Sequence, residues 1–245
     1  MILAIAGREL RGGVVTSLIW VLLGGAQLTL GWVFLQVADK FSGLGADERT
    51  TSLSTELALN LFGVAAVVLL IAAPLIAMRL LSAELRDGTY DLIGSSPVRI
   101  WQIVVGKYLG LVALLTPLCL LPALNLLLLA GGAPLDAGHF AAATLGLWLA
   151  GLLFAAVGLF GSSLSAQPGA AVLAAFGILL LLSVIGRTEA LGATGLSLFG
   201  WLAWSEHLLW FLLGAVRLSD LVYFVGFAGL FLALTHRRLA NRQLL

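Results

Sequence analysis

Residues 74–107 read PLIAMRLLSAELRDGTYDLIGSSPVRIWQIVVGK and lie between two long apolar runs. The stretch is rich in charge, and its charged residues are Arg79, Glu84, Arg86, Asp87, Asp91, Arg99 and Lys107. A membrane protein does not place so many charged side chains in lipid, so we expect an aqueous loop that joins two membrane helices.

The middle of this loop carries the sequence signals that mark helix ends. Gly88 is a typical helix stop, and Thr89 is a typical N-cap with Asp91 in the first turn, where a carboxylate suits the helix dipole. Ser96 and Pro97 repeat the signal, because serine caps a helix and proline fits its first position. We therefore predict a short helix inside the loop, with polar ends and an apolar middle, followed by a second apolar helix.

The composition supports a protein that lies almost entirely in a membrane. Of its 245 residues, 61% are hydrophobic and 10% are charged, and the mean hydropathy is +1.09. A soluble domain has roughly 25% charged residues. The net charge of +1 says nothing in favour of nucleic-acid binding, and we expect no nucleic-acid partner. The single cysteine, Cys119, lies in an apolar run, which excludes a disulfide framework or a cysteine-based metal site.

The apolar runs are long enough for six membrane spans, since each span needs about 20 apolar residues. The expected spans cover residues 14–38, 57–81, 100–130, 139–163, 170–186 and 221–235. We therefore predict an all-α integral membrane protein in which residues 1–245 form a single transmembrane domain.

The first residues of the chain have an amphipathic pattern. Apolar side chains oppose Arg8, Glu9 and Arg11, as in a helix that lies on the membrane surface. A signal peptide is the alternative. The apolar run 14–38 is too long for the apolar core of a signal peptide, which spans about 7–15 residues, so we favour an interface helix followed by a membrane span.

Residues 187–220 are more than a loop. Their middle is apolar and aromatic, but Glu206 and His207 interrupt it, so a full crossing is not expected. A re-entrant or interfacial hairpin fits this pattern better. Trp204, Glu206 and His207 are then candidates for an outer gate.

Basic residues predict the orientation. With both termini inside, nine basic residues lie on the inner side and four on the outer side. The inner residues are Arg8, Arg11, Arg79, Arg86, Arg99, Lys107, Arg237, Arg238 and Arg242, and the outer ones are Lys40, Arg49, Arg187 and Arg217. The positive-inside rule then places the loop and both termini in the cytoplasm, with the chain in a bacterial inner membrane.

The loop also has a recognisable pattern. The run A-x-R-x-x-x-x-E-x-x-x-G-T-x-D-L-x-x-S-S-P-V starts at Ala77 and is followed by Gly106 and Lys107. It resembles the permease subunits of ABC-2 type transporters, especially the branch of the gliding-motility and nitrous-oxide-reductase maturation permeases. A weaker likeness covers nearly the whole chain, including Asp220 and Tyr223 near its end.

The resemblance implies that the loop carries a coupling helix that docks on a separate ATPase. The residues that it assigns to this coupling are Glu84, Arg86, Asp87, Gly88, Thr89, Tyr90, Asp91, Ser96 and Pro97. It also implies a dimer of ATP-binding subunits, a second permease copy or paralogue, and an accessory periplasmic protein as partners.

No ATPase is expected in the chain itself. The phosphate-binding pattern G-x-x-x-x-G-K-[ST] is absent, since Tyr108 follows Gly106 and Lys107. We therefore expect no catalytic, cofactor or metal residues here, and ATP and Mg²⁺ bound by the partner subunit. The expected function is an exporter permease that converts ATP hydrolysis in another chain into movement of a substrate or a force across the membrane.

Other interpretations remain open at this stage. The loop could be an ordinary structured loop, with Glu84 paired to Arg79 or Arg86, and with Lys107 and Arg79 reaching lipid phosphates. Glu206 and His207 are expected to be interfacial polar residues with their hydrogen bonds made rather than metal ligands. The whole protein could instead be an intramembrane enzyme or a structural subunit without transport activity.

Overall fold

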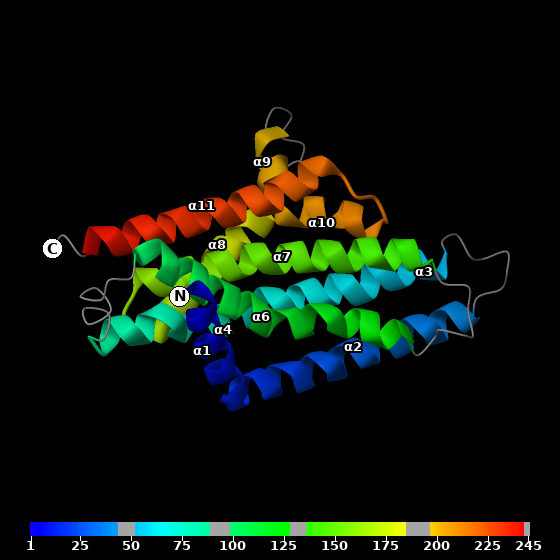
Figure 1. Cartoon of the computed structure of the whole chain (residues 1–245). Helices are drawn as coiled ribbons and strands as arrows, with labels where there is room; N and C mark the ends of the chain where they lie inside the picture. The colour runs from blue at the N-terminus through cyan, green and yellow to red at the C-terminus, as the bar shows by residue number, and fades with distance from the viewer. Residues whose placement is uncertain (44–51, 89–98, 128–135, 185–196, 243–245) are drawn as a thin grey trace.

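The structure is a computed structural model, and it describes residues 1–43, 52–88, 99–127, 136–184 and 197–242. Figure 1 shows an elongated bundle of helices, and no strand occurs in these ranges. The helices are α1 (Ile2–Val15), α2 (Ser17–Gly43), α3 (Leu53–Leu57), the π-helical turn η2 (Ala58–Phe62), α4 (Gly63–Arg86), α6 (Ile100–Leu127), α7 (Ala137–Leu164), α8 (Pro168–Val184), α9 (Ser197–Leu202), α10 (Trp204–Leu212) and α11 (Leu218–Arg242).

Five of the described helices are long and apolar enough to cross a membrane. They are Ser17–Gly43, Leu53–Arg86, Ile100–Leu127, Ala137–Leu164 and Leu218–Arg242. The remaining expected span corresponds to α8, whose 17 apolar residues are about 25 Å long, a little less than a typical hydrocarbon core. The prediction of an all-α integral membrane protein is confirmed.

The last helix is longer than its predicted span. The apolar pattern predicted residues 221–235, but α11 has 25 residues and ends at Arg242. Thr235 and Leu239 are buried. The segment that carries Arg237, Arg238 and Arg242 is therefore part of α11 and packs against the bundle. The polar residues after Thr235 end the apolar run, but the helix continues through them, so hydropathy alone placed its end too early.

Helix α7 is the centre of the bundle and packs against α4, α6, α8, α10 and α11. Its small residues allow this. A Cβ atom on Gly158 would lie 2.8 Å from Cβ of Ala77 in α4, and one on Gly161 would lie 2.9 Å from the carbonyl oxygen of Ala171 in α8. The small-residue pattern of the sequence therefore marks a helix that its neighbours approach closely.

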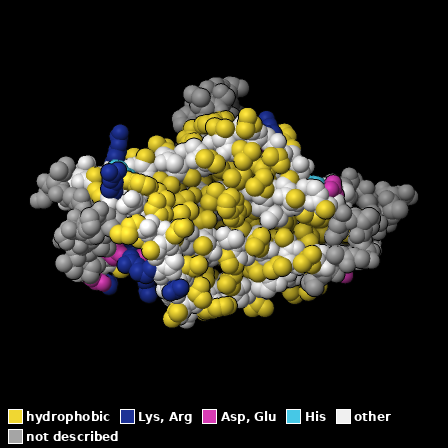
Figure 2. Space-filling view, in the orientation of Figure 1, with side chains coloured by type: hydrophobic (Ala, Val, Ile, Leu, Met, Phe, Trp, Pro, Cys, Tyr) yellow, Lys and Arg dark blue, Asp and Glu magenta, His cyan; other side chains and the backbone are white. Residues whose placement is uncertain are grey.

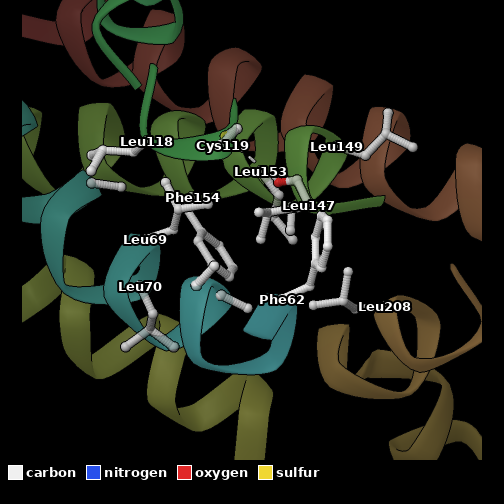
Figure 3. Packing of buried hydrophobic residues seen from close by; sticks show 14 of the residues in the cluster. Phe62, Leu69, Leu70, Leu118, Cys119, Leu147, Leu149, Leu153, Phe154 and Leu208 are labelled. Atoms are coloured by element: carbon white, nitrogen blue, oxygen red, sulfur yellow. Dashed lines mark hydrogen bonds between the residues drawn. The ribbon is translucent and has the colours of Figure 1, made fainter. Parts of the chain in front are cut away.

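Large apolar side chains fill the space between these helices. Figure 3 shows Phe62 and Leu69 facing Phe154 of α7, with Cys119 of α6 and Leu208 of α10 near them. All five side chains are buried. In lipid, such packing is the main attraction between helices, because lipid tails are as apolar as the side chains themselves.

Helix α1 lies across one end of the bundle, and the chain turns at Thr16 into α2 (Figure 1). None of its residues is buried, and its main contacts are with α6. The predicted amphipathic helix at the start of the chain is therefore present. The side of α1 that contacts α6 carries Ile5, Ala6 and Glu9, whereas Arg11 is exposed.

In the described part of the predicted hairpin region, which begins at Ser197, the chain forms two short helices before α11. Ala203 separates α9 from α10, and α10 packs against α7 and α11. The turn after α10 ends at Gly214, whose φ of +83° lies in the left-handed region and favours glycine. The prediction that this region does not cross the membrane as one continuous helix therefore agrees with the break at Ala203.

Basic side chains gather at the end of the bundle that holds both termini (Figure 2). This end holds the last turn of α4, the first turns of α6, helix α1 and the end of α11. At the opposite end the structure describes only Lys40 and Arg217 as basic residues.

Candidate functional site

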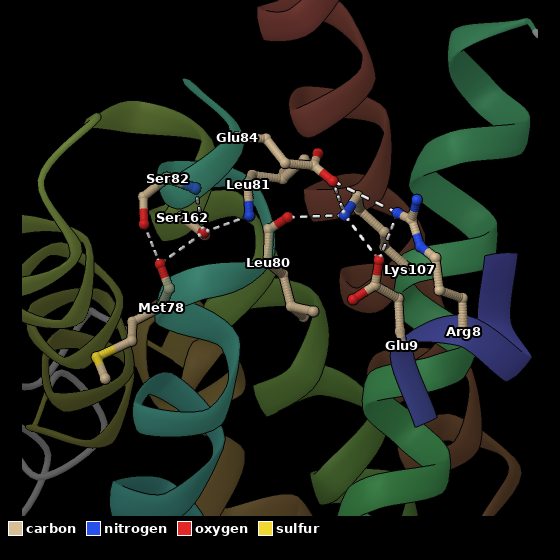
Figure 4. A network of polar contacts seen from close by, with 9 residues as sticks. All are labelled: Arg8, Glu9, Met78, Leu80, Leu81, Ser82, Glu84, Lys107 and Ser162. Atoms are coloured by element: carbon tan, nitrogen blue, oxygen red, sulfur yellow. Dashed lines mark hydrogen bonds and ion pairs between the residues drawn. The ribbon is translucent and has the colours of Figure 1, made fainter. Parts of the chain in front are cut away.

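Four charged residues from three helices meet at the end of the bundle that holds α1. We call Arg8 and Glu9 of α1, Glu84 of α4 and Lys107 of α6 the ion cluster (Figure 4). The Lys107 Nζ atom lies 2.9 Å from Glu9 Oε1 and 2.8 Å from Glu84 Oε1. Arg8 Nη2 lies 2.9 Å from Glu9 Oε1 and 3.5 Å from Glu84 Oε1. The cluster thus connects three helices with two cations and two carboxylates.

Lys107 is the buried centre of the ion cluster. Its side chain is only 1% exposed, whereas that of Arg8 is 63% exposed. In addition to the two carboxylates, the ammonium donates to the Leu80 carbonyl oxygen at 2.8 Å. An ammonium group has three donors, and all three are used here. A charge this deeply buried is stable only because its partners compensate the loss of water.

The sequence brings α1 close to α6 through two glycines one turn apart. A Cβ atom on Gly110 would lie 2.8 Å from Cβ of Glu9 and 3.1 Å from the Ala6 carbonyl oxygen. A Cβ atom on Gly106 would lie 2.8 Å from Cβ of Ile5. Only a helix without side chains on this face lets the Glu9 carboxylate reach Lys107.

The charges of the ion cluster shift the pKa values of its α1 members. Burial acts to raise the pKa of Glu9, but the Lys107 charge and the hydrogen bonds from Arg8 and Lys107 outweigh it, so the pKa is lowered. The hydrogen bond to Glu9 raises the pKa of Arg8. Both shifts favour the ionised forms of Glu9 and Arg8.

A buried serine on α7 extends this connection. Ser162 Oγ accepts hydrogen bonds from the backbone N–H groups of Leu81 at 3.0 Å and Ser82 at 3.1 Å, and donates to the Met78 carbonyl oxygen at 3.1 Å (Figure 4). The Ser82 hydroxyl also donates to the Met78 carbonyl oxygen. The last turns of α4 are therefore bonded to α7 on one side and to Lys107 on the other.

The coupling residues predicted on α4 lie directly after this anchored turn. Helix α4 ends at Arg86, Asp87 caps it, and Gly88 has a φ of +68°. The predicted helix stop at Gly88 is confirmed, because glycine enters the left-handed region without a Cβ clash. Arg86 and Asp87 form an exposed ion pair at 3.1 Å.

The rest of the predicted coupling helix lies outside the described residues. These positions are Thr89, Tyr90, Asp91, Ser96 and Pro97. Their predicted role stays a prediction. The described structure resumes at Arg99, eight residues before Lys107, so the ion cluster joins the two helices that flank this segment.

The structure decides two interpretations about the ion cluster. Local pairing of Glu84 with Arg79 or Arg86 was left open, but residues five or two apart on a helix do not face each other, and Glu84 binds Lys107. Lys107 was expected to reach lipid phosphate, but its ammonium points inward. Gly106 and Gly110, on either side of Lys107, are a sequence signal for the close approach of α1 that brings Glu9 to Lys107.

Of the other predicted interface residues, Arg8 and Glu9 belong to the ion cluster, and Arg11 is exposed. The predicted outer-gate residues also differ in their exposure to solvent. Trp204 is buried and donates to the Leu179 carbonyl oxygen at 3.2 Å, whereas Glu206 is exposed in the first turn of α10.

His207 has hydrogen-bond partners on both ring nitrogens, as predicted. Nδ1 lies 2.7 Å from Asp220 Oδ1, and Nε2 lies 2.8 Å from the Trp201 carbonyl oxygen. The ring stacks on Tyr223 at 4.0 Å. Among the described residues, no group of three His, Cys, Asp or Glu side chains could hold a metal ion. The His207–Asp220 pair therefore holds α10 against the start of α11.

Comparison with known proteins identifies the family. The model of the family described as ABC-2 family transporter protein matches residues 44–204, which is more than half of the chain. No curated protein matches the sequence. The matched region includes α4, the segment after it, and the part of α6 that carries Lys107. The chain belongs to the ABC-2 family of transporter proteins, as a membrane permease of an ABC transporter.

Proposed function

We propose that the chain couples ATP hydrolysis in a separate subunit to export across the membrane. The observation that carries this proposal is the position of the ion cluster. It joins α4 and α6 close to the ends from which segment 89–98 leaves and returns, and it joins α1 to both. A partner that moves this segment acts first on these joined ends.

The contacts in the ion cluster favour movement of these helices as one body. Lys107 connects α6 to α4 and to α1, and Ser162 connects α4 to α7. Buried hydrogen bonds and ion pairs are costly to break, so a displacement of segment 89–98 moves the helices together more easily than it separates them. The spans then tilt as a rigid group, which is a common form of conformational switching.

The orientation supports the same mechanism. With the ion cluster in the cytoplasm of a bacterial cell and the chain in its inner membrane, the basic residues of α1, α4, α6 and α11 lie on the inner side, as the positive-inside rule requires. Segment 89–98 then faces a cytoplasmic ATPase. ATP and Mg²⁺ bind to that partner, which acts as a dimer beside a second permease copy or paralogue, with an accessory periplasmic protein on the outer side.

The first test is co-purification of the tagged chain with its native membrane partners in detergent. Thr89→Pro and Tyr90→Asp should each remove a bound ATP-binding protein, because proline breaks a short helix and a charge spoils an apolar contact surface. Gln167→Asp is the matched control. It adds the same charge to the exposed turn between α7 and α8, which lies at the same end of the bundle but outside segment 89–98.

ATP hydrolysis by the captured complex completes the test. The proposal predicts an ATPase in the wild-type and Gln167→Asp preparations and its loss from the other two. Equal capture of an ATPase by all four proteins would remove segment 89–98 from the interface. Capture of no ATP-binding protein at all would favour the structural-subunit or enzyme interpretation.

A further inference from the structure

A pocket opens where α1 turns into α2, beside the ion cluster. It lies between this turn and the neighbouring faces of α4 and α6, and it is separate from segment 89–98. Its walls carry backbone and short side chains on one side and branched apolar side chains on the other. Lining residues that matter here are Gly12, Thr16, Ile19, Leu75, Arg79 and Leu114.

Arg79 gives this pocket an uncompensated positive charge. Glu9 also lines the pocket, but Lys107 and Arg8 neutralise it, since the ion cluster has two cations and two carboxylates. Arg79 itself makes no ion pair or hydrogen bond with any residue in the described ranges, and it is exposed. The pocket therefore attracts an anion, and a guanidinium binds phosphate oxygens well.

The apolar part of the pocket lies deeper in the membrane than Arg79. Leu75 is one helical turn before Arg79 on α4, about 6 Å further from the charged end of the bundle. Leu114 is two turns beyond Lys107 on α6, on the same deeper side. The pocket thus has a cationic group at the headgroup level and hydrocarbon walls below it, which is the order of groups in a phospholipid.

We propose that this pocket is a binding site for one anionic phospholipid. Its phosphate binds Arg79, and the upper part of one acyl chain lies against Leu75, Ile19 and Leu114. The cavity holds about 170 Å³, the volume of several water molecules at about 30 Å³ each, so it receives the linker and first methylene groups while the remaining chain stays in the bilayer. The site is independent of the proposed ATP coupling.

Native mass spectrometry of the full chain in detergent, with any partner that co-purifies, tests this site. The probes are phosphatidylglycerol, phosphatidylcholine with the same acyl chains, and inorganic phosphate. We expect phosphatidylglycerol to bind at one site, at least about tenfold more tightly than phosphatidylcholine. Arg79→Gln should weaken its binding about tenfold, as expected when one charge-assisted hydrogen bond is lost.

Two further variants separate the pocket from general charge attraction. Arg238→Gln removes an exposed charge from α11 at the same end of the bundle and should leave binding unchanged. Gly12→Leu should block binding without disturbing the fold, because no atom lies within 4 Å of a Cβ atom at this position. Helix α1 also tolerates leucine better than glycine.

Three results would overturn the proposal. Equal losses in Arg79→Gln and Arg238→Gln would show attraction by net charge alone. Equal binding of the two lipids would show that the pocket does not select an anion. Competition by millimolar inorganic phosphate, with no contribution from the acyl chains, would identify a site for free phosphate instead of a lipid.

Discussion

Glu84 and Lys107 are 23 residues apart in the sequence, and their side chains meet at 2.8 Å between two helices. The segment between them contains the predicted coupling helix. The two residues therefore close a loop whose movement must act on both helices at once. Glu9 binds the same ammonium, so α1 is part of the same unit.

The first prediction concerns the buried ammonium. Lys107→Met should destabilise the protein by about 3–5 kcal/mol, because Glu9 and Glu84, whose side chains are largely shielded from solvent, then lose the ammonium that they share. Loss of helical circular dichroism on heating in detergent measures this change.

Two variants provide the controls for Lys107→Met. Lys40→Met removes an exposed lysine in the last turn of α2, at the end of the bundle opposite to the ion cluster. It should change stability by less than about 0.5 kcal/mol. The triple variant Glu9→Gln, Glu84→Gln and Lys107→Met should recover a large part of the loss. If Lys107→Met is as stable as Lys40→Met, the ion cluster does not hold these helices together.

A second prediction follows from the lowered pKa of Glu9. A carboxyl group whose pKa is lower in the folded state stabilises the fold at pH values above its ordinary pKa of 4.5. That contribution is lost as the pH falls from 4.5 through the lowered pKa of Glu9. In this range Glu9 takes up a proton in the unfolded chain before it does so in the folded chain, which favours unfolding. The wild type should lose stability in this range.

The comparison with Glu9→Gln isolates this effect from other carboxyl groups. Melting temperatures of both proteins between pH 3 and about pH 7 should differ most at neutral pH and converge in acid. A difference that stays constant over this range would mean that Glu9 does not titrate against Lys107 and Arg8 in the folded state.

A third prediction compares two adjacent buried serines. Ser162→Ala leaves the backbone N–H groups of Leu81 and Ser82 without the hydroxyl that they bind, and should cost about 1–3 kcal/mol. Ser163 donates only to Phe160 in its own helix, so Ser163→Ala should cost less. Thermal unfolding of the two variants side by side checks this. Equal losses would show that the link between α4 and α7 is unimportant.

A fourth prediction concerns the close approach of α1 to α6. Gly110→Leu should push α1 away, because the new side chain would overlap Glu9 and Ala6. Trypsin should then cleave after Arg8 and Arg11 several times faster than in the wild type. Gly24→Leu is the matched control, since nothing lies within 4 Å of a Cβ atom at this exposed position. Unchanged cleavage in Gly110→Leu would mean that α1 does not depend on this contact.

The sequence predicted much of the fold because apolar length is a local property. The runs that became α2, α4, α6, α7 and α11 could be counted directly, and Gly88 marked the end of α4 as expected. The hairpin region was also recognisable, since Glu206 and His207 interrupt its apolar run. Such features depend on residues that are neighbours along the chain.

The partners of buried charges could not be predicted in the same way. His207 was expected to have its hydrogen bonds made, but that its partner is Asp220 depends on how α10 meets α11. For Glu84, pairing with basic residues of its own helix was one open interpretation, because these are its neighbours in the sequence, but its partner is Lys107. Helix geometry directs the side chains of Arg79 and Arg86 away from Glu84, and spacing along the sequence alone does not show this.

By itself, the sequence determined that this chain is a helical membrane protein, roughly where its long apolar helices lie and which residues form its basic side. These properties follow from composition and from spacing over about 20 residues. Only the tertiary structure decided that Lys107 is the buried centre of a link between α1, α4 and α6. The reason is physical: a buried charge needs compensating partners within about 3 Å, and helix packing alone decides which distant residues come that close.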